Sequence, residues 1–168
     1  MAKKATYEEL EQRVRELEQA ESERKHAEEA LRESEALLRA AIESTEDGIL
    51  VVDENGETII ANSRFRRMWR MPEELFNKKD DEKMLSFVLD QLKAPDDFLS
   101  KVQNLYGTTK EDLDLLNFKD GRIFERYSRP MTIGEKLTGR VWSFRDITKR
   151  TQSEVALRES EVFLKVLI

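Results

Sequence analysis

The sequence has no cysteine among its 168 residues, which excludes disulfides, thiolate nucleophiles and cysteine-ligated metal sites. Glycine and proline are also scarce, with six and three residues, and this composition suits long helices beside a compact domain. No apolar run is long enough to span a membrane, and the first residues, MAKKATYEELEQ, lack the apolar stretch of a signal peptide. We therefore expect a cytoplasmic location and no membrane segment in this chain.

Clusters of basic residues without interleaved acids are missing as well. The net charge is -6, and binding to phosphates requires a positive face, so nucleic acid is not expected as a partner. The sequence has no Walker-type phosphate loop, no HExxH motif and no glycine-rich nucleotide fingerprint. Helix capping explains the adjacent acids Asp80-Asp81 and Asp96-Asp97, and we expect Asp96 or Asp97 to cap the helix that follows. No catalytic residue and no metal site are predicted, so we do not expect an enzyme.

The first 43 residues contain leucines at multiples of seven, which is typical of a coiled coil. The apolar heptad positions are Tyr7, Leu10, Val14, Leu17, Leu31, Leu38 and Ile42. Glutamates at residues 21, 28 and 35 occupy other core-type positions, so the predicted seam is tight at both ends and loose between them. Because so long a helix needs a partner in water, we expect a parallel homodimer; the alternative is a solvated helix that lies on its own domain.

The central part of the chain changes to short β-branched runs. The stretch GILVVDENGETIIAN predicts two strands joined at Asn55-Gly56, a dipeptide that suits a tight hairpin turn. Residues 62–105 have a helical period that is interrupted at Pro72 and at Pro95. Three more strands are predicted in EDLDLLNFK, GRIFERYSRP and LTGRVWSFRDIT, and a helix resumes after Thr148 and continues to the end.

These motifs, in this order, resemble a PAS sensor domain. The resemblance rests on GILVVDENGETIIAN, a following helix with Phe65 and Trp69, then KDGRIFERYSRP, then GRVWSFRDITKR. It implies an α+β fold, with a five-stranded antiparallel sheet and helices on one face. The expected segments are a coiled-coil helix at 1–43, the PAS domain at 44–148 and an exit helix at 149–168. The resemblance also implies a sensory and dimerisation module of a multidomain bacterial-type signal-transduction protein, such as a two-component system.

One segment is repeated within the chain. ALRESE occurs at residues 30–35 and again at 156–161, and the offset of 157 − 31 = 126 residues corresponds to one domain with its linker. By resemblance to PAS proteins, the second copy is the lead helix of a further domain, so we expect a downstream output domain. The alternative is that two charged helices converged on the same residue types.

The only histidine, His26, lies in the first helical segment on the side away from the seam. We expect it to be a solvated surface residue. A phosphoacceptor histidine is the alternative, but Ala27 stands where sensor kinases usually have an acidic residue after such a histidine.

Alternation along the predicted strands indicates where a ligand would bind. Phe124, Arg126 and Ser128 share one face of their strand, as do Trp142 and Phe144 on theirs, and Leu115 and Asn117 on theirs. By resemblance these three sets all face the helices, where PAS ligands sit. The candidate ligand-binding residues are Asn62, Phe65, Trp69, Asn117, Phe124, Arg126, Ser128, Trp142 and Phe144. The alternative is that the aromatics only fill a core; an inward Arg126 then requires a carboxylate or an anionic ligand.

The residues that the sequence lacks narrow the choice of cofactor. A flavin adduct requires cysteine, and the usual PAS haem is held by a histidine inside the domain, so both are disfavoured. A non-covalent flavin or a small organic ligand, including an organic acid, stays open. Two functions compete: a ligand or redox sensor that acts on the exit helix, and a ligand-free dimerisation and relay module.

The triplet Asp146-Ile147-Thr148 ends the last predicted strand, and resemblance marks it as the joint between sensor and output. We expect Thr148 to accept a hydrogen bond from an amide in the first turn of the exit helix, and Asp146 to pair with Arg150. The predicted signal relay therefore comprises these three residues and Arg150.

Overall fold

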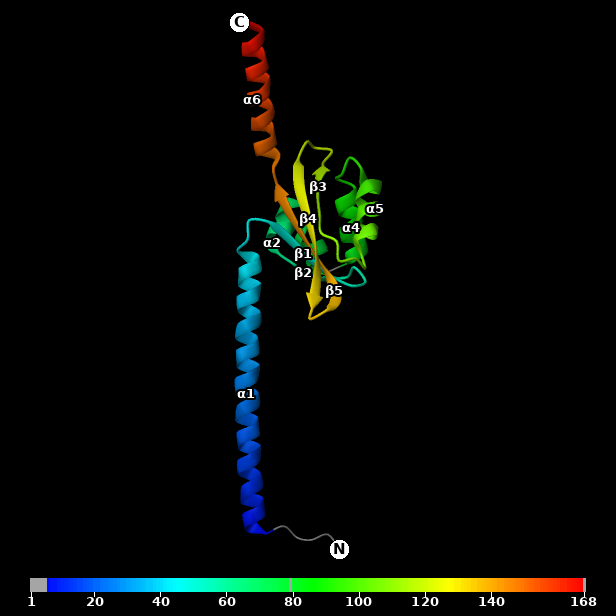
Figure 1. Cartoon of the computed structure of the whole chain (residues 1–168). Helices are drawn as coiled ribbons and strands as arrows, with labels where there is room; N and C mark the ends of the chain where they lie inside the picture. The colour runs from blue at the N-terminus through cyan, green and yellow to red at the C-terminus, as the bar shows by residue number, and fades with distance from the viewer. Residues whose placement is uncertain (1–5, 79, 168) are drawn as a thin grey trace. The chain divides into compact units, whose positions relative to one another are not determined.

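The computed structural model describes residues 6–78 and 80–167, and Figure 1 shows its elements. The ends of the predicted segments 1–43 and 149–168 therefore lie partly outside the described residues. The chain divides into two compact units, Met1–Ser44 and Thr45–Ile168. None of the helices in the described ranges combines the length and the hydropathy that crossing a membrane requires.

The described part of the first unit forms one helix, α1, from Tyr7 to Glu43. Thr6 caps its start: the Thr6 hydroxyl accepts from the Glu9 amide at 3.3 Å, and the Glu9 carboxylate accepts from the Thr6 amide at 2.9 Å. This reciprocal capping box satisfies two amides that the first turn leaves unpaired. Six of the seven predicted seam residues are exposed, namely Tyr7, Leu10, Val14, Leu17, Leu31 and Leu38, while Ile42 is partly buried. His26 is exposed beside Glu29.

The second unit contains a five-stranded antiparallel sheet with the order β2-β1-β5-β4-β3. The strands are β1 (Gly48–Asp53), β2 (Thr58–Ala61), β3 (Asp112–Asn117), β4 (Ile123–Ile133) and β5 (Lys136–Asp146). The predicted fold class and the predicted order of strands and helices are both confirmed.

The turn between β1 and β2 follows the predicted Asn55-Gly56. Gly56 has φ +88°, a conformation that a residue with a side chain rarely adopts. One oxygen of Asp53 accepts from the amides of Asn55 at 2.8 Å and Glu57 at 2.9 Å, so a side chain holds the turn together. These hydrogen bonds keep the pKa of Asp53 below its ordinary value, although partial desolvation opposes them.

Among the described residues, four helices lie between β2 and β3: α2 (Ser63–Met68), α3 (Glu73–Lys78), α4 (Asp81–Leu89) and α5 (Pro95–Leu105). The side chain of Asp80 caps α4 by accepting from the Lys83 amide at 3.2 Å. The prediction that Asp96 or Asp97 caps the next helix is wrong. Ala94 is the N-cap of α5 and Pro95 its first residue, because proline lacks the amide that an N-cap would satisfy and already has the helical φ.

The core lies between the sheet and these helices. Its centre is an aromatic cluster in which the ring of Trp69 is 5.0 Å from Phe118, 5.7 Å from Phe124 and 5.4 Å from Phe144. Trp69, Phe118 and Phe124 are fully buried. Helix α6 (Thr148–Leu167) follows β5 directly and continues away from the sheet.

Candidate functional site

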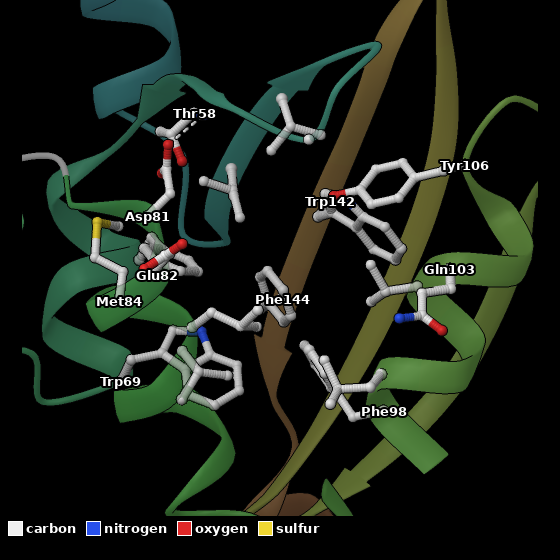
Figure 2. A pocket seen from close by; sticks show the side chains of 18 of the residues that line it. Thr58, Trp69, Asp81, Glu82, Met84, Phe98, Gln103, Tyr106, Trp142 and Phe144 are labelled. Carbon is white, nitrogen blue, oxygen red and sulfur yellow. Dashed lines mark hydrogen bonds between the residues drawn. The ribbon is translucent and has the colours of Figure 1, made fainter. Parts of the chain in front are cut away.

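A cavity of about 330 Å³ lies between the inner face of the sheet and helices α4 and α5 (Figure 2). Leu50 and Val52 of β1 and Trp142 and Phe144 of β5 form its sheet side, because alternate residues of a strand point the same way. Helices α4 and α5 supply the opposite wall, with Met84, Val88, Phe98 and Val102. The cavity is therefore mainly apolar and partly aromatic, as small-molecule sites usually are.

Four of the nine predicted ligand-binding residues line this cavity: Phe65, Trp69, Trp142 and Phe144. Trp69 is fully buried, and its indole Nε1 has no hydrogen-bond partner among the described residues. Less than 1 Å² of this nitrogen is accessible, so an acceptor in the cavity reaches it only when neighbouring side chains move. A buried donor without a partner lowers stability by about 1–3 kcal/mol, so an acceptor that binds this nitrogen would be favourable.

Two carboxylates lie at the first turn of α4, where Asp81 and Glu82 line the cavity. Asp81 accepts a hydrogen bond from the amide of Thr58 at 3.2 Å, which joins α4 to β2. Across the opening, burial raises the pKa of Tyr106, and the charge of Arg140 works against this while Asp81 adds to it. The phenol of Tyr106 thus stays neutral, and its ring packs edge-on against Trp142 at 6.4 Å.

The residues that α4, α5 and Tyr106 contribute were not singled out from the sequence. The available signal is the spacing of Phe98, Val102 and Leu105 at i, i+4 and i+7, which places one apolar stripe on α5. This apolar stripe predicts which face of α5 lies over the sheet.

Asn62, Phe124 and Ser128 are fully buried but lie outside the cavity lining. The amide oxygen of Asn62 accepts from the Phe65 amide at 2.8 Å and from the Ile49 amide at 2.9 Å. Asn62 therefore caps α2, ties it to β1 and positions Phe65 against the cavity. Ser128 accepts from the guanidinium of Arg140 at 2.8 Å.

Arg140 was not predicted as a site residue, yet it is almost fully buried. Its Nη2 donates to the carbonyl oxygens of Leu105 and Thr108, both at 2.9 Å, and its Nη1 donates to that of Lys110 at 3.0 Å. These bonds hold the end of α5, and with it Tyr106, beside β5. Arg140 is thus a positioning residue of the cavity wall.

Arg126 points inward and is 1% exposed. Its Nε and Nη2 donate to the two oxygens of Asp114 at 2.8 and 2.7 Å, so Asp114 supplies the carboxylate that an inward arginine requires. Burial alone would raise the pKa of Asp114, but the hydrogen bonds and charge of Arg126, with Lys101, outweigh it and lower that pKa. Arg126 lines a separate hollow at the edge of β3 and does not line the cavity.

The prediction that Leu115 and Asn117 share the face of Arg126 is wrong by one residue. In the register of β3 and β4, Asp114 is opposite Arg126 and Leu116 is opposite Phe124. Leu115 and Asn117 therefore point to the other face and are exposed. This register turns Asp112 and Asp114 inward, where they pair with Lys101 and Arg126, and it buries Leu116 in the core.

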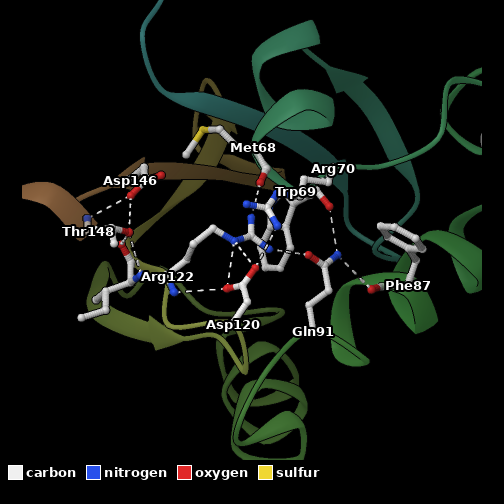
Figure 3. A network of polar contacts seen from close by, with 10 residues as sticks. Met68, Trp69, Arg70, Phe87, Gln91, Asp120, Arg122, Asp146 and Thr148 are labelled. Atoms are coloured by element: carbon white, nitrogen blue, oxygen red, sulfur yellow. Dashed lines mark hydrogen bonds and ion pairs between the residues drawn. The ribbon is translucent and has the colours of Figure 1, made fainter.

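The joint between β5 and α6 is hydrogen-bonded to the start of β4 (Figure 3). The Ile147 amide donates to the carbonyl oxygen of Ile123 at 3.0 Å, and the Ile123 amide donates to the hydroxyl of Thr148 at 3.0 Å. Asp146 accepts from the amide of Thr148 at 2.9 Å and also from its hydroxyl. Three hydrogen bonds thus fix the first residue of α6 to the sheet.

Two predicted contacts of this joint are wrong. Arg150 pairs with Glu154, one turn further along α6, at 3.2 Å and not with Asp146. Thr148 accepts an amide from β4 and not one from its own helix, because it is already the first helical residue and Asp146 precedes it as the acceptor.

A chain of polar contacts connects the cavity to this joint. Gln91 donates to the carbonyl oxygen of Trp69 at 2.9 Å and accepts from Arg122 Nη2 at 2.7 Å. Arg122 also donates to the carbonyl oxygen of Met68 at 2.6 Å, and its neighbour Ile123 binds Thr148 (Figure 3). Trp69 and the start of α6 are therefore linked by contiguous hydrogen bonds and one peptide step.

Comparisons with known proteins agree with this geometry. The family model of the PAS fold matches residues 42–155, which is more than half of the chain. No curated protein matches significantly. The structure of a PAS domain of an HTR-like protein from Haloarcula marismortui is similar, with a TM-score of 0.52 and 18% identity over 73% of this chain and 99% of that one. The PAS domain of BvgS from Bordetella pertussis has a TM-score of 0.50 and 14% identity over 77% and 97%.

A longer protein is matched only in part. The chain superposes on the sensor region of a sensor histidine kinase with a TM-score of 0.52 and 15% identity, over 64% of this chain and 41% of that one. The chain thus spans less than half of that structure. At these identities the structural matches establish the fold, and the family match over residues 42–155 establishes that the chain belongs to the PAS fold family.

Proposed function

We propose that this chain is a PAS sensory module that binds a small non-covalent ligand in the cavity and transmits its occupancy through α6 to a downstream output domain. The observation that carries the proposal is the cavity of about 330 Å³ with aromatic walls and the indole Nε1 of Trp69, which has no partner in the described part of the chain. Its volume falls at the small end of the range for small-molecule sites. A ligand with a hydrogen-bond acceptor would satisfy Trp69 while its body packs against Trp142 and Phe144.

Transmission in this proposal runs through the exit joint. Asp146, Ile147 and Thr148 fix α6 to β4, and Gln91 and Arg122 connect the joint to Trp69. A displacement of Trp69 by a ligand therefore has a direct mechanical route to the first turn of α6. A bound flavin is the redox variant of the same proposal, and the visible absorption spectrum of the purified protein distinguishes it.

The proposal is tested with 6-methylquinoline, a neutral aromatic whose ring nitrogen accepts a hydrogen bond. The chain has two tryptophans, and both line the cavity, so their indole N–H signals in an NMR spectrum report directly on occupancy. We expect both signals to shift, with a Kd on the order of 0.1–1 mM for a ligand of this size.

The matched control is a variant that fills the cavity. Val102→Trp, in the wall formed by α5, should abolish saturable binding, whereas Leu113→Trp, on an exposed position of β3, should leave it unchanged. Circular dichroism and thermal unfolding check that both variants are folded. Indole shifts that do not saturate, or that persist unchanged in a folded Val102→Trp variant, contradict a binding cavity.

A second candidate function, dimerisation with relay between helices, is favoured by the exposed apolar heptad of α1. Leu10, Leu17, Leu31 and Leu38 are each more than half exposed in the single chain. The segment repeated in α6 has Leu157 at the position that corresponds to Leu31, and this leucine is also exposed. We propose a parallel homodimer in which a second copy of the chain covers these leucines.

Replacing Leu10 and Leu17 by Ser should weaken this dimer strongly. Each substitution removes a buried leucine contact worth roughly 2 kcal/mol from the dimer, so the two together cost about 4 kcal/mol and the dissociation constant should rise on the order of 1000-fold. Leu37→Ser is the matched control, since Leu37 is equally exposed but lies next to the seam position Leu38 and outside the seam. Sedimentation that gives a monomer for the parent chain at tens of micromolar would contradict the dimer.

A further inference from the structure

The cavity carries charge of only one sign. Among the described residues that line it, the ionisable side chains are Asp81, Glu82 and Tyr106, and none is a cation. The two buried arginines nearby are directed elsewhere: Arg126 to Asp114, and Arg140 to backbone carbonyls and Ser128. Asp81 and Glu82 are therefore the charged side chains of the described lining, while the guanidinium of Arg126 lies behind the wall rings of Phe98 and Trp142, at 4.6 and 5.3 Å from their centroids.

The two carboxylates are available to a ligand. Glu82 is exposed, and Figure 2 shows its carboxylate directed into the space between α4 and β5. The adjacent cation, Lys83, is 2.6 Å from Asp80, and this pair lowers the pKa of Asp80. The Tyr106 phenol lies in the field of charges of both signs, because Arg140 lowers its pKa while Asp53 and Asp81 raise it, and burial has the largest effect.

The second polar feature of the cavity is Trp69. Its indole is fully buried, and Nε1 lacks an acceptor among the described residues. An N–H group can be satisfied only by an acceptor, such as a ring nitrogen, a carbonyl or an ether oxygen. The cavity consequently offers a donor on Trp69 and carboxylate acceptors on α4, with apolar walls for the body of the ligand.

We propose that the cavity selects an arylalkylamine: a flat aromatic body with a protonated amine that faces Asp81 and Glu82, and an acceptor atom that binds Nε1 of Trp69. The same charges disfavour organic acids and phosphorylated flavins, because like charges repel in a partly desolvated site. This inference rests on the proposed ligand-binding function and specifies its chemical class.

Three matched quinolines test the class. They share the ring nitrogen and differ in the substituent at position 6: a methyl group, an aminomethyl group or a carboxylate. At low ionic strength, 6-(aminomethyl)quinoline should bind about fivefold more tightly than 6-methylquinoline, and quinoline-6-carboxylate about fivefold more weakly, as expected for partly exposed charge pairs. Raising the salt concentration to about 0.5 M should reduce both differences to less than about twofold, because salt screens such pairs.

Two substitutions test whether Glu82 causes the preference for the amine. Glu82→Gln should reduce the preference for the amine over 6-methylquinoline from about fivefold to less than about twofold. Glu74→Gln is the control, since Glu74 is an exposed glutamate of α3 outside the cavity lining. The Trp69 indole proton should shift downfield with 6-methylquinoline and not with 2-methylnaphthalene, which has the same shape but no acceptor.

The outcomes distinguish the proposed charge preference from ligand binding itself. If 6-methylquinoline binds but the carboxylate binds as tightly as the amine, the charge class is overturned and the binding cavity stands. Equal affinities for the amine in the parent and in Glu82→Gln also overturn it. If none of the three quinolines gives a saturable shift of either indole signal, the ligand-binding function itself is overturned.

Discussion

Replacing Asp114 by Asn should lower the free energy of unfolding by about 3 kcal/mol at pH 7, because it leaves the buried guanidinium of Arg126 without its counter-ion. Arg126 is 1% exposed, and both oxygens of Asp114 accept its hydrogen bonds. The remaining nitrogen of Arg126, Nη1, already lacks a partner among the described residues, so no other acceptor replaces Asp114 in the variant. Urea unfolding of parent and variant measures the difference.

Asp112→Asn is the matched control for this prediction. Asp112 lies on the same strand and the same face, and it pairs with Lys101 at 2.8 Å, but its partner is partly exposed. Such a pair contributes up to about 1 kcal/mol, so the control should lose far less stability. Equal losses in the two variants would contradict the assignment of a buried ion pair to Asp114 and Arg126.

The same pair predicts how stability depends on pH. The pKa of Asp114 is lower in the folded chain than its ordinary value, because Arg126 and Lys101 outweigh the effect of burial. Its stabilisation is therefore complete above the pKa of an unfolded aspartate, about 4, and is lost as the pH falls through the lower folded value. The stability difference between parent and Asp114→Asn should accordingly shrink on acidification from pH 5 to about pH 2. A difference that stays constant over this range would contradict the mechanism.

The strand register explains what the sequence could predict and what it could not. Trp142 and Phe144 were placed in the cavity because β5 alternates regularly. In β3 the apolar Leu113 and Leu115 alternate equally well, yet they are exposed. The inward positions belong to Leu116, which is buried in the core, and to two acids, Asp112 and Asp114, whose partners Lys101 and Arg126 come from α5 and β4. A local pattern cannot reveal such a preference, since the cations that decide it are distant in the sequence.

Asn62 shows a different kind of error. It was assigned to the ligand because it precedes Phe65 in the helix that faces the sheet, whereas the structure places it at the N-cap of α2. An asparagine directly before a helix is a common capping signal, so this role was readable from the sequence. The unpaired Nε1 of Trp69 was not readable, because it depends on the packing of Phe118, Phe124 and Phe144 around one indole.

Asp146→Ala should loosen the first turn of α6 while the rest of the domain stays folded. The variant removes the acceptor of the Thr148 amide and of its hydroxyl, and loss of such a cap costs about 1 kcal/mol. Hydrogen exchange of the Thr148 and Thr151 amides should therefore accelerate about fivefold. Arg150→Ala, which breaks only the exposed pair with Glu154, should change these rates by less than about twofold.

The role of this joint in the relay is tested by adding a ligand to the same variants. In the parent, saturating 6-methylquinoline should change the exchange rates of Ile147 and Thr151, because Trp69 is linked through Gln91 and Arg122 to the strand that holds Thr148. The response should persist in Arg150→Ala and disappear in Asp146→Ala, since a relay requires α6 to be fixed to the sheet. If Asp146→Ala binds the ligand and its exit helix responds as strongly as that of the parent, Asp146 only caps the helix.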